Sequence, residues 1–287
     1  MIYNISSKKL DNPLLKDLLK ELTVFFNSIG VDFYIVGATA RDIVLCNLYE
    51  IISNRKTDDL DIAIAIADWE QFALIEQQLS QRSGFKKDRT QKQRFLYRDV
   101  YKVDIVPFGT VAKEDGNIYW PPNEEVAMSV WGFPEVAKET LTIQVDNDLI
   151  IRVASLPGLF LLKLSAWEDR NSTSKKDAFD IALLLVNYLN VNEKRAVDDY
   201  YDELYATDSF DPVIAGAQLI AHDVNLMLQG NADVLNRIKD IMSTEIALAE
   251  ESRLINQLLE SNGSLKYEQV LSCLEMMIEE WNTNIIN

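Results

Sequence analysis

The chain has 287 residues, of which 48% are hydrophobic and 25% charged, a balance typical of a soluble globular protein with one large or two modest domains. Its formal net charge of −17 opposes binding to duplex DNA or to an anionic membrane, because both partners are themselves polyanions. No run of eighteen apolar residues and no amino-terminal signal pattern occur, so we expect a cytoplasmic protein without a membrane span.

The first predicted elements are a helix and a short buried strand. Leu and Phe recur at helical spacing over 13–28, and an apolar strand follows at 33–36. The strand ends in two small residues, Gly37 and Ala38, and a second helix is predicted over 39–49. Backbone N–H groups at the start of such a helix can bind phosphate.

Two carboxylates accompany the next strand, predicted over 60–66. Asp59 and Asp61 are two positions apart, so they share one face of the strand, with their bases roughly 6.6 Å apart. Such a pair can bind one divalent ion or bracket two ions. A solvated edge strand or a capping pair is the structural alternative.

A third carboxylate belongs to a later strand. Three elements are predicted before it, one helix and two short strands: 68–81, 84–86 and 94–98. Asp104 then interrupts an apolar alternation over 101–108 and needs a partner or an ion. If that strand lies beside 60–66, Asp104 joins Asp59 and Asp61 in one cluster. A position facing water at the sheet edge is the alternative.

Basic residues are concentrated in one segment of this acidic chain. Eight basic residues stand against two acidic ones, Asp88 and Asp99, which gives a local net charge of 8 − 2 = +6. The eight are Arg82, Lys86, Lys87, Arg89, Lys92, Arg94, Arg98 and Lys102. The segment suits contact with an RNA backbone. A solvated basic hairpin that balances acidic neighbours is equally compatible with the pattern.

The stretch 108–134 is rich in turn residues and has the length of a functional loop or lid. Trp120 and Trp131 lie within it, and either can anchor the loop to the core or stack on a base. A hairpin is predicted after it, with strands over 141–145 and 149–153.

A second charged group lies on two later helices. Ser155 is a helix start, and Lys163 and Arg170 share one face of the helix that follows. Four charged residues open the next helix: Lys175, Lys176, Asp177 and Asp180. A salt-bridged helix pair, with Lys176 bound to Asp180 and Arg170 to Asp177, is the structural alternative. Only helices are predicted beyond residue 188.

These motifs resemble a known family. Gly37-Ala38 followed by Asp59-Leu-Asp61 is similar to the glycine and aspartate-x-aspartate signature of polymerase-beta-like nucleotidyltransferases. The order of the charged residues from Lys163 to Asp180 resembles the AbiEii/AbiGii toxin family, whose members belong to type IV toxin–antitoxin and phage-abortive systems. Ala38 stands where relatives often carry Gly or Ser, and it offers no hydroxyl to a phosphate.

The resemblance implies an α+β fold. A nucleotidyltransferase domain with a small mixed sheet would occupy residues 1–154, and an all-helical domain over 155–287 would complete the cleft. The implied reaction transfers a nucleoside monophosphate from an NTP to an acceptor. Two Mg²⁺ ions would assist it, bound by Asp59, Asp61 and Asp104.

The resemblance also implies the other site residues. Nucleotide-binding roles fall on six of them: Gly37, Ala38, Arg41, Lys163, Lys175 and Lys176. Lys163 would bind the triphosphate. Asp177, or Asp180 in its place, would align or deprotonate the acceptor hydroxyl.

Three functions remain open from the sequence. The first is a toxin-like enzyme that nucleotidylates RNA such as a tRNA end, with a cognate antitoxin as partner. The second is a transferase acting on a small cationic molecule such as an aminoglycoside, which the overall acidity favours. The third is a non-catalytic nucleotide-binding module, against which the intact Asp59, Asp61 and Asp104 argue.

Overall fold

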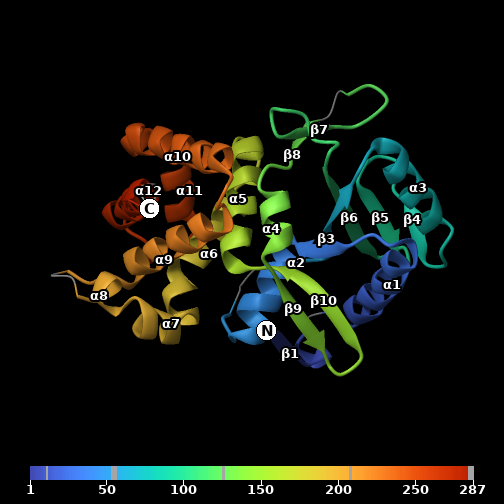
Figure 1. The fold of residues 1–287 in the computed structure, drawn as a ribbon, viewed down its shortest axis with the longest axis horizontal. Coiled ribbons are helices and arrows are strands. Elements are labelled where there is room, and N and C mark those ends of the chain that lie inside the picture. The colour runs from blue at the N-terminus through green and yellow to red at the C-terminus, as the bar shows by residue number, and fades with distance from the viewer. Residues whose placement is uncertain (11, 53–56, 125–126, 207–208, 284–287) are drawn as a thin grey trace. The chain divides into compact units, whose positions relative to one another are not determined.

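The structure is a computed structural model that describes residues 1–10, 12–52, 57–124, 127–206 and 209–283. The chain divides into two compact units, Met1–Ser155 and Leu156–Asn287. We call them the sheet unit and the helical unit, because the strands of the described residues all belong to the first (Figure 1). No helix within the described ranges is long and apolar enough to cross a membrane.

An eight-stranded mixed sheet forms the centre of the sheet unit, in the order β1-β9-β10-β2-β3-β6-β5-β4. Its strands are β1 (Ile2–Ile5), β2 (Phe33–Val36), β3 (Asp59–Ile66), β4 (Phe85–Lys87), β5 (Arg94–Tyr97), β6 (Tyr101–Gly109), β9 (Thr140–Val145) and β10 (Leu149–Ala154). The pairs β1–β9, β10–β2 and β3–β6 are parallel, and the other neighbours are antiparallel. The predicted α+β fold, with a mixed sheet followed by a helical region, is therefore confirmed.

The two faces of β3 differ in chemistry. Leu60, Ile62 and Ile64 are fully buried, and their antiparallel partners on β2 include Phe33, whose ring lies 5.0 Å from that of Phe26 on α1 (Pro13–Ile29). The alternation along the strand places Asp59 and Asp61 on the opposite face. Burial of the apolar face against α1 thus fixes the register that presents both carboxylates.

The chain turns from β2 directly into α2 (Gly37–Arg41), which continues as a π-helical segment, Asp42–Leu48. The helix predicted over 39–49 therefore begins two residues earlier than expected. Gly37 has a φ of +67°, a backbone conformation that permits this abrupt turn. Single π-helical turns are often found at functional sites.

Two further helices and a small second sheet complete this unit: α3 (Trp69–Ser80), α4 (Phe133–Lys138), β7 (Asn117–Tyr119) and β8 (Ala127–Ser129). β7, β8 and the start of α4 lie in the turn-rich stretch 108–134, for which the sequence predicted no helix or strand. Trp120 is buried and packs on Trp69 and Phe72 of α3, with ring centroids 5.1 and 5.4 Å away. It anchors this stretch to the unit's core, which is one of the two roles expected of it.

The helical unit contains eight α-helices in its described residues: α5 (Leu156–Arg170), α6 (Lys176–Val191), α7 (Glu193–Asp199), α8 (Tyr201–Leu204), α9 (Pro212–Met227), α10 (Ala232–Ala247), α11 (Arg253–Ser261) and α12 (Tyr267–Thr283). Small residues let α9 approach its neighbours closely. A Cβ at Gly216 would lie only 3.2 Å from the Leu185 carbonyl of α6. The buried Trp281 of α12 donates its indole N–H to the Ala221 carbonyl, 2.8 Å away.

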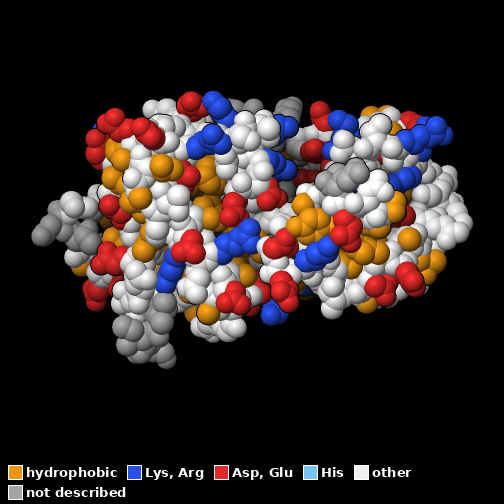
Figure 2. Space-filling view, turned by 90° about the horizontal axis from the view of Figure 1, so that it is seen from above, with side chains coloured by type: hydrophobic (Ala, Val, Ile, Leu, Met, Phe, Trp, Pro, Cys, Tyr) orange, Lys and Arg blue, Asp and Glu red, His pale blue; other side chains and the backbone are white. Residues whose placement is uncertain are grey.

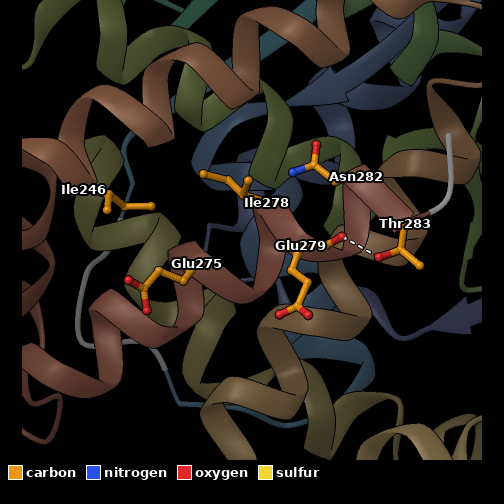
Figure 3. A pocket seen from close by; sticks show the side chains of 6 residues that line it. All are labelled: Ile246, Glu275, Ile278, Glu279, Asn282 and Thr283. Atoms are coloured by element: carbon orange, nitrogen blue, oxygen red, sulfur yellow. Dashed lines mark hydrogen bonds between the residues drawn. The ribbon is translucent and has the colours of Figure 1, made fainter.

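A hollow of about 490 Å³ opens in the helical unit beside α10 and α12 (Figure 3). Its lining residues are Ile246, Glu275, Ile278, Glu279, Asn282 and Thr283. Glu275 and Glu279 lie one helical turn apart, and no Lys or Arg belongs to the described lining. Because Glu275 and Glu279 repel phosphate and the described lining supplies no cation of its own, this hollow is not a candidate for nucleotide binding.

Candidate active site

Three carboxylates lie on one face of two adjacent strands in the sheet unit. Asp59 and Asp61 come from β3, and Asp104 from β6 stands directly opposite Asp61 in the parallel register. Partners in register point to the same side of a sheet, so the three side chains share one face. The structure therefore brings together the three acidic residues that the sequence nominated.

The turn before α2 fits closely against Asp61. A Cβ built on Gly37 would lie 2.2 Å from Asp61 Oδ2, so a side chain at this position would overlap the carboxylate. Thr39 ties the same turn to the start of β3 by donating its hydroxyl to the Asp59 carbonyl, 2.9 Å away. Ala38, between them, is buried. The glycine turn and the aspartate strand thus form one interlocked feature.

The third carboxylate already has a cationic partner. Arg94 of β5, directly opposite Asp104 in the antiparallel register, donates Nε to Oδ1 and an Nη to Oδ2, both at 2.7 Å. The hydrogen bonds that Arg94 donates to Asp104 raise the pKa of the arginine above its ordinary value. Asp104 is 8% exposed. From the sequence, Arg94 was considered only as part of the basic segment. Asp104, ten residues later on the neighbouring strand, was the signal that could have indicated this ion pair.

The donor set has the right chemistry for Mg²⁺, which prefers carboxylate oxygens. The described residues nevertheless form no group of three or more acidic, His or Cys side chains arranged to hold a metal ion. The carboxylate of Asp59 accepts a hydrogen bond from the Thr57 hydroxyl, and that of Asp104 is bound by Arg94. Both hydrogen bonds would have to open before the three carboxylates could hold a divalent ion, so the metal-binding role of Asp59, Asp61 and Asp104 stays a prediction.

Negative charge accumulates beside this face. Burial, followed by the negative charges of Asp59 and Asp58, raises the pKa of Tyr101 to about 12. Burial is the larger cause, so the two carboxylates account for only part of the shift.

Arg41, expected to contact phosphate, lies inside the unit. Its side chain is 1% exposed and donates Nε and an Nη to Asp42 Oδ1, at 2.8 and 2.6 Å. The phosphate-binding role assigned to Arg41 stays a prediction, and it requires the Asp42 pair to open.

The helical unit carries a separate buried cluster. Lys163 Nζ on α5 lies 2.6 Å from Asp180 Oδ2 and 3.4 Å from Asp177 Oδ1, both on α6. Arg170 forms a bidentate ion pair with Asp177, donating Nε to Oδ2 at 2.7 Å and an Nη to Oδ1 at 2.8 Å. Asp177 is 0% and Asp180 1% exposed. The Arg170–Asp177 pairing named as the structural alternative is present, and Lys163 joins it.

Opposing effects set the ionisation of Asp177. Burial would raise the pKa of this carboxyl, but hydrogen bonds from Arg170 and the charge of Lys163 hold it below its ordinary value. Asp177 is therefore ionised at neutral pH. The remaining two lysines are exposed: Lys175 pairs with Glu260 at 2.5 Å, and Lys176 begins α6. The nucleotide-binding roles of Lys163, Lys175 and Lys176 remain predictions.

Four of the eight residues of the basic segment pair with an acid among the described residues: Lys86, Lys87, Arg94 and Arg98. Lys87 binds Glu76 of α3, and Arg98 lies 3.4 Å from Asp17 of α1, both on the helix-covered side. On the face seen in Figure 2, Lys and Arg side chains intermingle with Asp and Glu side chains. The segment is therefore not one continuous basic surface.

Two lysines of the basic segment lie in register with Asp59. The register places Lys86 of β4, Leu96 of β5, Lys102 of β6 and Asp59 of β3 side by side in one row. Lys86 is exposed and only 3.5 Å from the equally exposed Asp99. Lys102 is exposed and has no hydrogen-bond or ion-pair partner among the residues that the structure describes. We call Lys86 and Lys102 the lysine row.

Comparisons with known proteins place these features in context. A family model described as "Nucleotidyl transferase AbiEii toxin, Type IV TA system" matches residues 26–260. No curated protein sequence matches the chain.

Several solved structures are similar in part. One is an antigenic nucleotidyltransferase-like protein from Paracoccidioides brasiliensis, at 18% identity over 63% of this chain and 77% of that one, with a TM-score of 0.39. Another is ANT(2")-Ia in complex with adenylyl-2"-tobramycin, at 16% identity over 63% and 94%, with a TM-score of 0.37. A tRNA-processing enzyme gives 14% identity over 93% and 74%, with a TM-score of 0.29.

Proposed function

For this chain, which belongs to the AbiEii family of nucleotidyltransferase toxins and is a nucleotidyltransferase, we propose that the acceptor is RNA, with a tRNA end as the specific form. The family description also supports a role as the toxin of a type IV toxin–antitoxin system, with a cognate antitoxin as partner. We place the reaction in the cytoplasm, where NTPs and RNA are found together.

The observation that carries the RNA proposal is the lysine row. Lys86 and Lys102 extend from Asp59 across three strands on the carboxylate face. Phosphates of an RNA strand laid along this row would be contacted by both ammonium groups while its end lies at the carboxylates. The net charge of −17 restricts such binding to a short stretch and disfavours extended contact with duplex DNA.

The proposed reaction needs a divalent metal ion and a group that removes the proton of the acceptor hydroxyl. Asp59, Asp61 and Asp104 would hold Mg²⁺, which when bound supplies charge neutralisation for the phosphates and lowers the pKa of the acceptor hydroxyl. The acceptor oxygen forms a bond to the α-phosphorus, the bond from that phosphorus to the bridging oxygen breaks, and pyrophosphate leaves. Gly37 lets the backbone of α2 approach this centre.

In the helical unit, Lys163 is proposed as the triphosphate-binding cation and Asp177 as the group that aligns or deprotonates the acceptor hydroxyl. Asp177 is ionised, but its oxygens accept hydrogen bonds from Arg170. Its proposed role therefore requires Arg170, whose side chain is half-exposed, to release it. Asp180 is the alternative carboxylate.

A small cationic acceptor such as an aminoglycoside is the second candidate. The overall acidity of the chain, with a formal net charge of −17, favours it. A cationic molecule would be attracted by Asp58 and Asp59 and repelled by the lysine row, so the two candidates make opposite demands on Lys86 and Lys102.

The test compares two doubly neutralised proteins. K86Q/K102Q removes the lysine row, and K20Q/R98Q removes two charges on the α1 side, where each pairs with an acid on the surface. Binding of labelled total tRNA is measured against salt concentration. We expect K86Q/K102Q to bind more weakly and to lose about two units of the logarithmic salt slope, one for each phosphate contact. The control should behave as the wild type. Equal tRNA binding by both variants would reject RNA as the partner of this face.

A further inference from the structure

The pair between Arg94 and Asp104 has features beyond those of an ordinary cross-strand ion pair. It is bidentate, with both contacts at 2.7 Å, and one partner is a carboxylate nominated for the metal site. Each oxygen of Asp104 accepts one N–H of the fork, an arrangement that fixes the plane of the carboxylate. Asp61 stands beside Asp104 on the next strand.

Two charges therefore compete for the same carboxylate. Without Arg94, the face would carry three carboxylates, and their mutual repulsion would favour a divalent cation strongly. With Arg94 in place, Asp104 is neutralised by a guanidinium, and an entering cation must meet that positive charge at close range. The arginine side chain is 22% exposed against 11% for that of Asp104, so the arginine has the freer path to solvent.

We propose that Arg94 is a positioning residue that holds Asp104 until a divalent cation replaces it, and that this exchange sets the metal affinity of the site. The inference rests on the proposed metal-binding role of Asp59, Asp61 and Asp104. It assigns to Arg94 two effects: it orients Asp104 in the metal-free protein, and it weakens the binding of the cation that completes the site.

A purely structural ion pair would behave in the opposite way. Loss of its cation would leave Asp104 without its fork, free to turn away from Asp61, and metal binding would weaken or stay unchanged. The sign of the change in metal affinity therefore separates the two roles.

The experiment titrates the full chain with Mn²⁺ in the absence of NTP and RNA. Electron paramagnetic resonance monitors the fraction of Mn²⁺ that is bound. We expect R94Q to bind Mn²⁺ on the order of tenfold more tightly than wild type, the effect of removing one positive charge from beside a divalent ion in a site partly screened by water. R94K keeps the charge but loses the fork, so its affinity should fall between those two. R94Q/D104N should lose the gain, because the third carboxylate is gone.

R98Q is the matched control. It removes the same charge from the turn after β5 but has its partner on α1, at Asp17, and its Mn²⁺ affinity should equal that of wild type. Circular dichroism confirms folding, and R94K decides the question if R94Q does not fold. Unchanged or weaker Mn²⁺ binding by a folded R94Q, or by R94K in its place, would overturn the proposal. Mn²⁺ binding that survives in D59N/D61N would instead reject the metal site itself, which is a separate failure.

Discussion

The contact between Gly37 and Asp61 allows a sharp test of how the glycine turn serves the site. In G37A the new Cβ would lie 2.2 Å from Asp61 Oδ2, whereas real Cβ atoms stay beyond about 3 Å. The carboxylate must therefore move by about 1 Å, a displacement of the scale that can cost about a hundredfold in rate when it affects reacting groups. A φ of +67° adds left-handed strain of about 1–2 kcal/mol.

Gly30 provides an unusually close control. It has a φ of +66°, nearly the same as Gly37, but a Cβ there would meet nothing within 4 Å. G30A should therefore lose about 1–2 kcal/mol of unfolding free energy and keep full activity. G37A should lose at least as much stability and, in addition, about a hundredfold in transfer rate.

The assay combines urea unfolding with initial rates of transfer from a labelled NTP, at temperatures where both variants are folded. Transfer by G37A within threefold of that by G30A would refute the argument that Gly37 is required by the position of Asp61.

Three further predictions concern groups outside that contact. Lys163→Ala removes the cation shared by the buried Asp177 and Asp180, so unfolding in urea should show a loss of about 3–5 kcal/mol, and a loss under 1 kcal/mol would contradict the buried-pair account. Because the pKa of Asp177 is depressed in the folded protein, its ionised carboxylate stabilises the fold above the ordinary aspartate pKa, and this stabilisation is lost as pH falls through the lower folded pKa. As pH is lowered from 6 to 2, the melting temperature of Asp177→Asn should therefore fall less steeply than that of the wild type. Trp120→Ala should lower the unfolding free energy by about 3–5 kcal/mol, since this ring fills a buried site against α3, and a loss below 1 kcal/mol in urea would refute the anchoring role.

The elements nearest the site were the easiest to predict from the sequence. β2 is a short continuous apolar run, and β3 and the first half of β6 alternate apolar with polar residues. α1 has a distinct apolar stripe, with Asn12 at its start and Gly30 at its end. Burial of one face dictates these patterns, so the sequence carries them directly. The family resemblance is confirmed by the match over residues 26–260.

Features that depend on tertiary pairing were missed. β1 is a four-residue edge strand in which only Ile5 is buried, so it has too little pattern to be recognised, and its parallel pairing with β9 joins residues about 140 positions apart. The pairing of Arg94 with Asp104 depends on hairpin register, which is set by turn geometry as well as by composition. Nothing in the spacing of Lys163 indicated that it would lie between two carboxylates of α6.

The carboxylate face is proposed to catalyse nucleotidyl transfer to RNA. The most direct measurement incubates the purified protein with each α-labelled NTP, Mg²⁺ and total RNA, and then locates the label, with D59N/D61N in parallel. These amide substitutions keep the shape of the side chains but remove two metal-binding charges. We expect label in RNA with the wild type and none with the double variant, which should still unfold cooperatively. Equal labelling of RNA by both proteins would contradict the site, and label found only on a small cationic acceptor would contradict RNA as the substrate.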